Sequence, residues 1–558
     1  MNELNEEMKK CPFCAETIKK EAIICRFCGS NLVDEKNKNV NLPSVNPEPV
    51  KEARTKINIS DGFNIGCGIF LSILFIILVI TFILFGMCAT ILDDTSKPSS
   101  IKNENTHKED ISYYDSIVVK GAIYHADSKY TSAIKEYTKA IKINPIDAGV
   151  YNNRGLVYSD KGDHNHAIED FNKAISIDPN LSTAYYNRGN EYLARFDYDK
   201  AIEDYNKAIS IFPNHSKSFC NRGFIHFTTK KYDLAIEDFT KAISLDPKDD
   251  IAYNNRGLAY HEKGEYKLAI KDYNVAIDLS QKAVDLNKGI VIVNDYLFYF
   301  NRGITFDKMG NYDLAMNDYN KVISLSSKYA PAYNNRGIVF SDKGDYDLAI
   351  KDYTKAIKLS PKEPDYYNNR GLAYLDKEDY NLAIRDFTKI TVIDPNYAMA
   401  FVNRGWTFFM QGNNDNAIYD YNKAISINKD LALAYNNRGL SYFIKGDDVK
   451  AYEFLQKAIL LSKKIKDKSE SLGYISLIHL KNEELDKALS VIESISQEED
   501  VDTNYHFFKA ISAYESGKND IAKASYQKWM NLKTKEDEKV LKKILPIKFQ
   551  NYLDKFPL

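Results

Sequence analysis

The tripeptide Asn-Arg-Gly recurs nine times in this chain of 558 residues. It stands at residues 153–155, 187–189, 221–223, 255–257, 301–303, 335–337, 369–371, 403–405 and 437–439. Successive copies are 34 residues apart, except for one step of 46. A fixed period of this size is typical of a repeat architecture, in which each unit buries its apolar face only against its neighbours. The length therefore does not imply three or four separate domains.

One regular unit runs from Ala252 to Ile277 and reads AYNNRGLAYHEKGEYKLAIKDYNVAI. Tyr253 and Tyr260 fall on one face of a predicted helix around Gly257. Gly264 then interrupts the pattern, and Ala269, Tyr273 and Ala276 mark the inner face of a second helix. Several units end in Asp-Pro, which cannot continue a helix, at 178–179, 246–247 and 394–395. Each unit is thus predicted to be a helix–turn–helix.

These small, aromatic, Gly and Pro positions resemble the tetratricopeptide repeat. Two departures are that Tyr stands where the family usually has Trp, and Arg where it has Leu before the Gly. The resemblance implies an all-α, right-handed superhelical solenoid of about 12 units over residues 114–465, with degenerate units and a capping helix within 466–558. A weak first unit contains Gly121, Ala133 and Tyr137, and the degenerate units centre on Ala488 and Ala522. The 46-residue step places an insertion at about 278–295, which either extends a helix or forms a loop.

An acidic residue follows most of these glycines by fifteen positions, which gives each Arg a candidate partner. We expect the acid of each unit to pair with the Arg of the next and to set the stacking register. The alternative is that all of these charges are solvated and contribute little. The predicted pairs run from Glu136–Arg154, Asp170–Arg188 and Asp204–Arg222 to Asp420–Arg438; Phe454 replaces the acid of the last strong unit.

The Asn before each Arg carries the functional prediction. In the family, the first helix of each unit lines a concave groove, and a repeated Asn resembles the ladder that holds an extended peptide backbone. An amide suits this task because it both donates and accepts hydrogen bonds. The alternative is an Asn bonded to a neighbouring repeat. The candidates are Asn153, Asn187, Asn221, Asn255, Asn301, Asn335, Asn369, Asn403 and Asn437.

Aromatic residues gather in the late units. Trp406 and Phe409, together with Phe401, Met410 and Phe443, are candidates for an apolar patch in the groove that receives partner side chains. Ordinary packing between repeats is the alternative for each of them.

Two Cys pairs lie near the N-terminus, at Cys11-Pro-Phe-Cys14 and Cys25-Arg-Phe-Cys28. Two such pairs suit one tetrahedral structural zinc ion, whose binding would supply the folding energy of so short a module. Residues 9–33 resemble the zinc ribbons at the N-termini of many bacterial membrane-anchored proteins, and we assign residues 1–33 to this module. A redox or disulfide role is the alternative. Seven Cys, four of them in these pairs, do not form a disulfide framework.

A single membrane span is predicted next. Residues 34–61 have the composition of a linker, residues 62–92 contain no charge and are long enough to cross a bilayer, and residues 93–113 form a polar stalk. Basic residues are nearly even on the two sides of the span. Zinc thiolates favour a reducing compartment, so we expect the N-terminus in the cytoplasm of a bacterial cell and the repeats outside.

No sequence motif assembles a nucleophile with a base or a phosphate loop, so we expect a protein without enzymatic activity. The net charge of −2 provides no field that would recruit nucleic acid. The leading expectation is a membrane-anchored scaffold that binds proteins or peptides in the groove. The alternative is a regulatory protein whose zinc ribbon contacts nucleic acid or a cytoplasmic partner.

Overall fold

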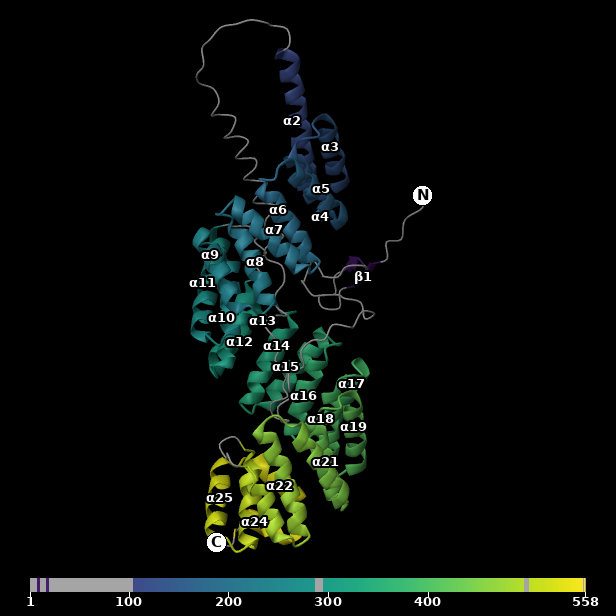
Figure 1. The fold of residues 1–558 in the computed structure, drawn as a ribbon, viewed down its shortest axis with the longest axis vertical. Coiled ribbons are helices and arrows are strands. Elements are labelled where there is room, and N and C mark those ends of the chain that lie inside the picture. Colours follow the sequence, from purple (N-terminus) through teal and green to yellow (C-terminus); the bar gives the residue numbers. More distant parts are fainter. Residues whose placement is uncertain are drawn as a thin grey trace. The chain divides into compact units, whose positions relative to one another are not determined.

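The computed structural model describes residues 8–10, 17–19, 104–286, 295–495, 501–554 and 556 (Figure 1). The chain divides into two compact units. The helices up to residue 327 belong to the first unit, and the helices from residue 328 onward belong to the second. Thirteen consecutive helix pairs make up the described chain from residue 104, which confirms an all-α repeat solenoid.

In the first unit the helices are α2 (Glu104–Ala126), α3 (Tyr130–Ile143), α4 (Ala148–Lys161), α5 (His164–Ile177), α6 (Ser182–Ala194), α7 (Tyr198–Ile211), α8 (Ser216–Thr228), α9 (Tyr232–Leu245), α10 (Asp250–Glu262), α11 (Tyr266–Leu286), α12 (Tyr296–Lys308) and α13 (Tyr312–Leu325). In the second they are α14 (Ala330–Asp342), α15 (Tyr346–Leu359), α16 (Pro364–Asp376), α17 (Tyr380–Ile393), α18 (Ala398–Met410), α19 (Asn414–Ile427), α20 (Ala432–Ile444), α21 (Asp448–Leu461), α22 (Ile465–Lys481), α23 (Leu485–Glu493), α24 (Thr503–Glu515), α25 (Asn519–Leu532), α26 (Lys535–Ile544) and α27 (Ile547–Asp554).

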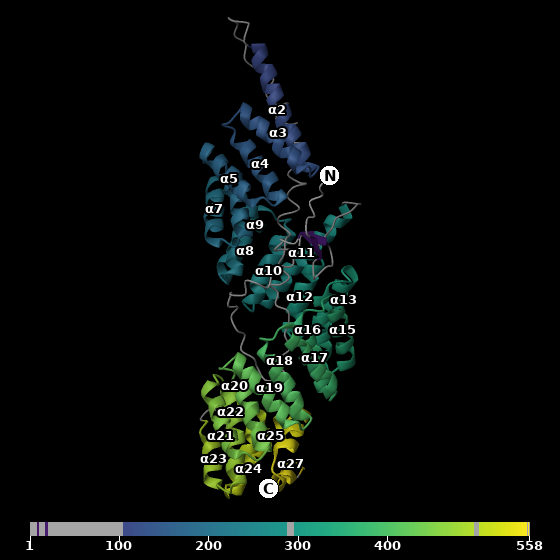
Figure 2. The ribbon, with the colours of Figure 1, turned by 90° about the vertical axis from the view of Figure 1, so that its right-hand side faces the viewer.

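The two helices of a repeat lie side by side, as α16 and α17 do (Figure 2). The motif Gly makes this close contact possible. At Gly337, an added Cβ would lie 2.7 Å from the Cε1 atom of Tyr353 in the second helix. The Tyr353 side chain is fully buried between Ala349 and Ala356, which are themselves fully buried. Gly in the first helix and Ala in the second therefore admit a large aromatic ring between two closely packed helices.

The turns and the repeat boundaries follow the sequence prediction. Gly264 has a φ of +79°, a left-handed conformation that ends the first helix at little cost. Lys230 and Glu378 occupy the equivalent turns with φ values of 60° and 64°, where a side chain is strained. Asp178, which precedes a Pro, is extended with φ −125° and ψ 95°, and α5 ends there.

Three expectations about helix bounds need correction. Helix α2 begins at Glu104, ten residues before the expected first unit, because residues 104–113 contain neither Pro nor Gly and continue the helix. Helix α11 has 21 residues where α9 has 14, so the insertion begins by extending a helix; residues 287–294 lie outside the described chain. The single capping helix expected within 466–558 is two helices, α26 and α27, because Pro546 holds Leu545 extended at ψ 134°.

The N-terminal region is described only at a short antiparallel hairpin. Strand β1 (Met8–Lys10) pairs with β2 (Thr17–Lys19), with Met8 opposite Lys19. The predicted zinc ligands Cys11, Cys14, Cys25 and Cys28 lie outside the described residues, and so does the predicted span at 62–92. Among the helices that are described, none joins the length and the apolar character that crossing a bilayer requires.

Candidate binding face

First helices of neighbouring repeats contact one another in both units. Helix α4 contacts α6, and α10 contacts both α8 and α12; in the second unit, α16 contacts α14 and α18, and α20 contacts α18 and α22. Neighbouring repeats are therefore close to one another along their first helices. This is the inner side of a curved stack, where a groove is expected. We call it the inner face.

Each Arg–acid ion pair forms between the two helices of one repeat. The prediction of pairs between neighbouring repeats was wrong. Arg154 donates from Nε and Nη2 to both oxygens of Asp170, each at 2.7 Å. The same two-pronged pair joins Arg188 to Asp204, Arg222 to Asp238, Arg256 to Asp272, Arg302 to Asp318, Arg336 to Asp352, Arg370 to Asp386 and Arg404 to Asp420, at 2.6–2.9 Å.

The physical reason is that the two helices of one repeat pack most closely at this level. The Arg precedes the motif Gly, and the acid precedes the aromatic residue that lies against that Gly. Glu136, the expected partner of Arg154, instead accepts a hydrogen bond from Lys139 in its own helix at 2.7 Å. Burial raises the pKa of Asp420 even beside Arg404, so desolvation outweighs the attraction for this carboxyl. Such a pair fixes geometry more than it adds stability.

The register between repeats is set by other contacts of the same Arg. The Nη1 atom of Arg404 donates to Thr388 in the second helix of the preceding repeat at 3.0 Å, and Arg188 reaches Asn172 in the same way at 2.6 Å. At the turns, Lys263 pairs with Asp233 of the preceding repeat at 2.6 Å. Arg404 and Arg188 therefore each pair with the acid in the second helix of their own repeat. Each also donates a hydrogen bond to the second helix of the preceding repeat.

Arg438 differs from the other motif arginines because its repeat has no acid at the pairing position. Phe454 stands where the acid would be, and its ring centre lies 3.6 Å from the guanidinium carbon of Arg438. Nη1 still donates to Asn422 in the preceding repeat at 2.6 Å. The Nε atom is buried without a hydrogen-bond partner among the described residues, and burial lowers the pKa of Arg438. A stacked ring has replaced a carboxylate in this repeat.

The Asn ladder joins repeats to one another. Asn187 donates to Asn152 of the preceding repeat at 2.9 Å, and Asn301 donates to Asn254 in the same way at 2.9 Å. The same contact, at 2.9 Å, joins Asn369 to Asn334 and Asn403 to Asn368, and Asn221 donates to a differently placed amide, Asn190 of the preceding repeat, at 2.8 Å. These contacts confirm, for these residues, the alternative of bonding to a neighbouring repeat.

Burial limits what the ladder offers to a ligand. Seven of the nine motif amides are buried, and only Asn153 and Asn187 are partly exposed. The contacts between repeats use the Nδ2 atoms of Asn301 and Asn403, whereas the Oδ1 atoms of these two residues are buried without a hydrogen-bond partner among the described residues, which is costly. A direct contact with a peptide stays a prediction for Asn153 and Asn187; the buried Asn221, Asn255, Asn301, Asn335, Asn369, Asn403 and Asn437 belong to the wall of the face.

The aromatic patch of the late repeats is covered by the chain's own C-terminal segment. The rings of Trp406 and Phe409 are stacked, with centres 5.2 Å apart, and the Phe409 side chain is fully buried. They belong to one apolar cluster with Phe443 of α20 and with residues of α26 and α27. The residues from the C-terminal segment are Val540, Leu541, Ile544, Leu545, Phe549, Leu553 and Phe556. No sequence signal predicted this fold-back.

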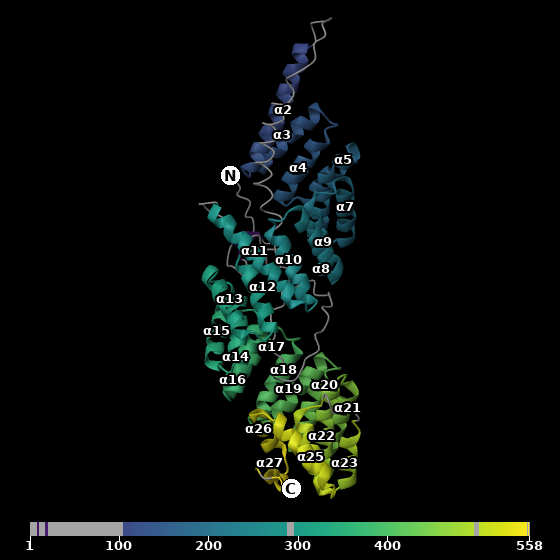
Figure 3. The same ribbon diagram turned by 90° about the vertical axis from the view of Figure 1, so that its left-hand side faces the viewer.

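Figure 3 shows α26 among the helices of the second unit. Two lysines of α26 contact the C-terminal ends of the first helices of two earlier repeats. Lys543 donates from Nζ to the main-chain oxygen of Met410, the last residue of α18, at 2.8 Å, and lies 5.3 Å from the centre of the Phe409 ring. Lys539 pairs with Glu378 at 3.0 Å and lies 5.5 Å from the centre of the Tyr380 ring. A cation at the C-terminus of a helix meets its exposed carbonyls and the negative end of its dipole.

Carboxyl groups converge near the start of α26. Burial and the nearby Asp502 raise the pKa of Glu470, which accepts a hydrogen bond from Tyr474 at 3.0 Å. Burial and the charge of Asp537, in the first turn of α26, raise the pKa of Asp502. Glu470 also faces Asp467 and the Asn436 side chain. The three acids Glu470, Asp502 and Asp537 repel one another when they ionise.

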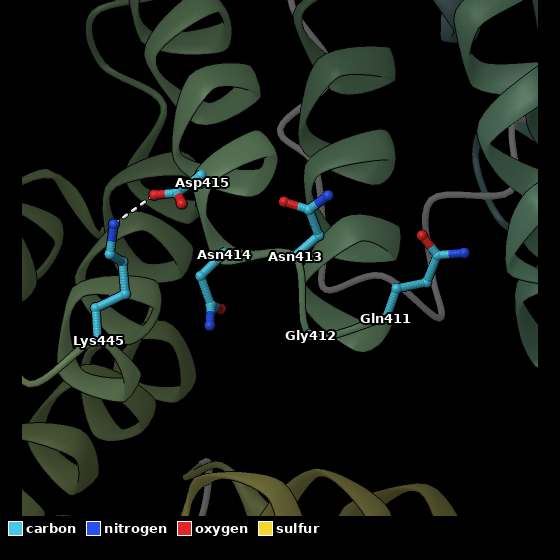
Figure 4. A pocket seen from close by; sticks show the side chains of 6 residues that line it. All are labelled: Gln411, Gly412, Asn413, Asn414, Asp415 and Lys445. Carbon is cyan, nitrogen blue, oxygen red and sulfur yellow. Dashed lines mark hydrogen bonds and ion pairs between the residues drawn. The ribbon is translucent and has the colours of Figure 1, made fainter.

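A shallow depression lies at the turn between α18 and α19 (Figure 4). It is lined by Gln411, Gly412, Asn413, Asn414, Asp415 and Lys445. Lys445 pairs with Asp415 across it, which is another contact between neighbouring repeats. Apart from Lys445 and Asp415, the side chains drawn in Figure 4 point in different directions and do not converge, so the depression lacks the polar groups of a ligand site.

Comparison with known protein families supports the repeat assignment. Models of the tetratricopeptide repeat match residues 148–181, 182–215 and 364–397, and a second such model matches residues 251–282 and 432–465. A further model described as a TPR repeat matches residues 121–162, 225–264, 305–344, 339–378 and 407–446. Together these matches cover more than half of the chain. No curated protein matches it at a significant level.

Several solved structures are similar in fold. A tetratricopeptide repeat protein from Parabacteroides merdae ATCC 43184 is 22% identical, with 47% of this chain and 98% of that chain covered and a TM-score of 0.36. MamA is 28% identical over 30% of this chain and 96% of its own, with a TM-score of 0.28. Yeast Tom70 is 17% identical over 79% and 96%, with a TM-score of 0.37. With its Asn-Arg-Gly units, its paired helices and the repeat-family models that match more than half of its length, the chain belongs to the tetratricopeptide repeat proteins.

Proposed function

We propose that this protein is a membrane-anchored scaffold that binds segments of other proteins along the inner face of its repeats. The observation that carries the proposal is the position of α26. A helix lies against the ends of α16 and α18, with its apolar residues in the cluster of Trp406 and Phe409. The late repeats therefore accept a helical protein segment, here one from the same chain.

The inner face of the first unit supports the same function. Tetratricopeptide repeat proteins bind protein partners, and α4 and α6, the first helices of two repeats, carry partly exposed polar and apolar side chains, among them Asn153, Leu156 and Asn187. The matched families are repeat families, without a catalytic domain among them. A mixed surface of this kind suits main-chain hydrogen bonding beside small apolar contacts.

A photocrosslinking amino acid placed at Asn153 or Leu156 tests this function in intact cells. We expect specific protein adducts from these positions and none from the matched position Lys173, which is exposed on the second helix of the same repeat. A captured protein, once purified, should bind the wild-type chain and bind the Leu156→Glu variant at least tenfold more weakly. Equal adducts from Lys173, or binding that this substitution leaves unchanged, would contradict a role for the inner face.

The N-terminal part of the proposal rests on the sequence. The uncharged run at 62–92 favours a single span, and two CxxC pairs favour one structural zinc ion held by Cys11, Cys14, Cys25 and Cys28. We propose a bacterial cell membrane location with the N-terminus in the cytoplasm. Protease accessibility of the repeats in spheroplasts tests the orientation. Protection of the repeats until the membrane is broken would reverse it.

Zinc is tested by measuring the metal content of the purified full-length chain. We expect about one zinc ion per chain, lost in the Cys11→Ser/Cys14→Ser variant and retained in the control Cys220→Ser, because Cys220 is a buried residue of α8 far along the chain. Metal content that does not depend on Cys11 and Cys14 would count against the ribbon.

A further inference from the structure

Helix α26 shows which kinds of side chains the late repeats can bind. We define the α26 seat as Glu378, Tyr380, Trp406, Phe409 and the main-chain oxygen of Met410. The helix brings two kinds of groups to the apolar cluster and the seat. Val540, Leu541, Ile544 and Leu545 form its buried stripe, and Lys539 and Lys543 stand four residues apart beside that stripe. Residues three and four apart share one face of a helix, so both lysines meet the seat together.

The seat favours cations in two independent ways. Glu378 lies in the turn after α16 and offers a carboxylate to Lys539. Met410 ends α18, so its carbonyl faces outward with the negative end of the helix dipole, and the Phe409 ring presents its π face to Lys543. An acidic helix would meet a carboxylate, a carbonyl and an aromatic face, all of which repel anions.

The polar contacts of α26 are weak enough to exchange. The Lys539–Glu378 pair is solvent-exposed, with 61% of the Glu378 side chain accessible, and such pairs contribute at most about 1 kcal/mol. Lys543 has no carboxylate within ion-pair distance among the described residues, although it is partly buried. At the other end, Asp537 approaches Asp502, which in turn lies near Glu470. The apolar stripe holds α26 in place, and its charged groups add little.

We propose that α26 is a displaceable internal occupant, and that the partner fitting the α26 seat is an amphipathic helix with an apolar stripe flanked by two lysines four residues apart. This inference rests on the proposed scaffold function and names the partner class for the second unit. When α26 occupies the α26 seat, it covers the aromatic patch of the late repeats. A partner helix with the same pattern of apolar residues and lysines displaces α26 and makes the same contacts with the seat. Binding is then limited by the fraction of chains in which the seat is open.

A labelled peptide of residues 534–556 is the probe, because it carries the complete C-terminal segment. Its binding is measured by fluorescence anisotropy to the full-length chain and to the full-length Leu541→Asp/Ile544→Asp variant, whose own α26 cannot remain in the cluster. We expect the variant to bind the peptide at least tenfold more tightly than the wild type. A peptide carrying Lys539→Glu and Lys543→Glu should bind at least tenfold more weakly than the unchanged peptide.

Exchanging the charges of Glu378 and Lys539 gives a second test, which does not depend on whether the Leu541→Asp/Ile544→Asp variant folds. Glu378→Lys in the full-length chain should weaken docking of α26, and Lys230 in the equivalent turn of another repeat shows that lysine is compatible with this backbone. Adding Lys539→Glu to this variant should restore the docking of α26. Docking is measured as the protection of the α26 amides from hydrogen exchange. Failure of this rescue, together with peptide binding no tighter in the Leu541→Asp/Ile544→Asp variant, would overturn the proposal.

Two other outcomes are informative. A concentration-dependent dimer of the Glu378→Lys chain would identify the occupant as a second copy of α26, and would replace a foreign helix as the partner. Crosslinking from Asn153 addresses the first unit and does not involve the α26 seat. Loss of peptide binding with intact Asn153 adducts would therefore reject the seat and leave the scaffold function standing.

Discussion

The Arg before each motif Gly makes the most demanding contacts of any single residue in the repeat. Arg404 donates two hydrogen bonds to Asp420, whose side chain is 1% exposed, and a third to Thr388. Replacing it with Met would leave a buried carboxylate without its cation. We expect Arg404→Met to lower the free energy of unfolding by about 3 kcal/mol, measured by urea denaturation.

Arg438 supplies the matched control. It contacts Phe454 and Asn422 but forms no ion pair with a carboxylate among the described residues, and its Nε atom has no hydrogen-bond partner among them. Arg438→Met should cost less than about 1 kcal/mol, because Met also packs against an aromatic ring. Similar losses for both variants would mean that the stacking of the Arg side chain, and not its ion pair, is what matters.

The motif Gly is constrained by space. At Gly337 a Cβ would lie 2.7 Å from Tyr353, a distance that requires the two helices to move apart. We expect Gly337→Ala to destabilise the chain by about 1–3 kcal/mol, despite the better helix propensity of Ala. Thermal unfolding gives the measurement. The control is Gly149→Ala in α4, where the nearby atom belongs to the Asp147 side chain; a loss at Gly149 as large as at Gly337 would refute the packing explanation.

At the scale of the helix pair, the turn offers a place to gain stability. Lys230 has a φ of 60°, whereas the equivalent residue in the following repeat is Gly264. Lys230→Gly should raise the free energy of unfolding by up to about 1 kcal/mol, because the left-handed conformation is costly for a residue with a Cβ. Lys231→Gly is the control, since Lys231 has a φ of −87°. Stabilisation by both substitutions would point to another cause.

The acids beside α26 predict a pH dependence. Burial raises the pKa of Glu470 from its ordinary value of 4.5 to about 8, so the folded chain keeps a proton that the unfolded chain loses. The contribution of Glu470 to the free energy of unfolding is fully favourable at pH values below its ordinary pKa of 4.5. This contribution is lost as pH rises toward about 8. The urea midpoint of the second unit should therefore fall between pH 5 and 8.5, and Glu470→Gln should reduce that fall. An identical pH profile for the variant would exclude Glu470 as the cause.

At the scale of the whole chain, the repeat was predictable and its exceptions were not. Gly337, Tyr353 and the Asp-Pro ends recur at fixed positions, so periodicity identified the helices and their inner faces. The ion pairs were assigned to the wrong neighbour because Asp170 is sixteen residues after Arg154 and eighteen before Arg188, and sequence spacing cannot choose between them. Packing of the two helices within a repeat makes that choice.

The binding face was harder to predict for the same reason. The periodic Asn was identified, but its bonding to an Asn of the preceding repeat depends on how closely first helices approach. The fold-back of α26 leaves no periodic signal, since Lys543 and Met410 are 133 positions apart. A stack of repeats is held by nearest neighbours, and a contact over this distance is an addition to that scheme.

Hydrogen exchange of the full-length wild-type chain compares the opening of α26 with that of the repeats it contacts. If α26 is a displaceable occupant of a binding face, its amides should exchange with an opening free energy at least about 2 kcal/mol below that of α18 and α24. Unlabelled peptide 534–556 in excess should accelerate exchange of α26 further and leave α18 protected. Protection of α26 equal to that of α18 and α24, unchanged by the peptide, would show that the segment is a fixed part of the fold.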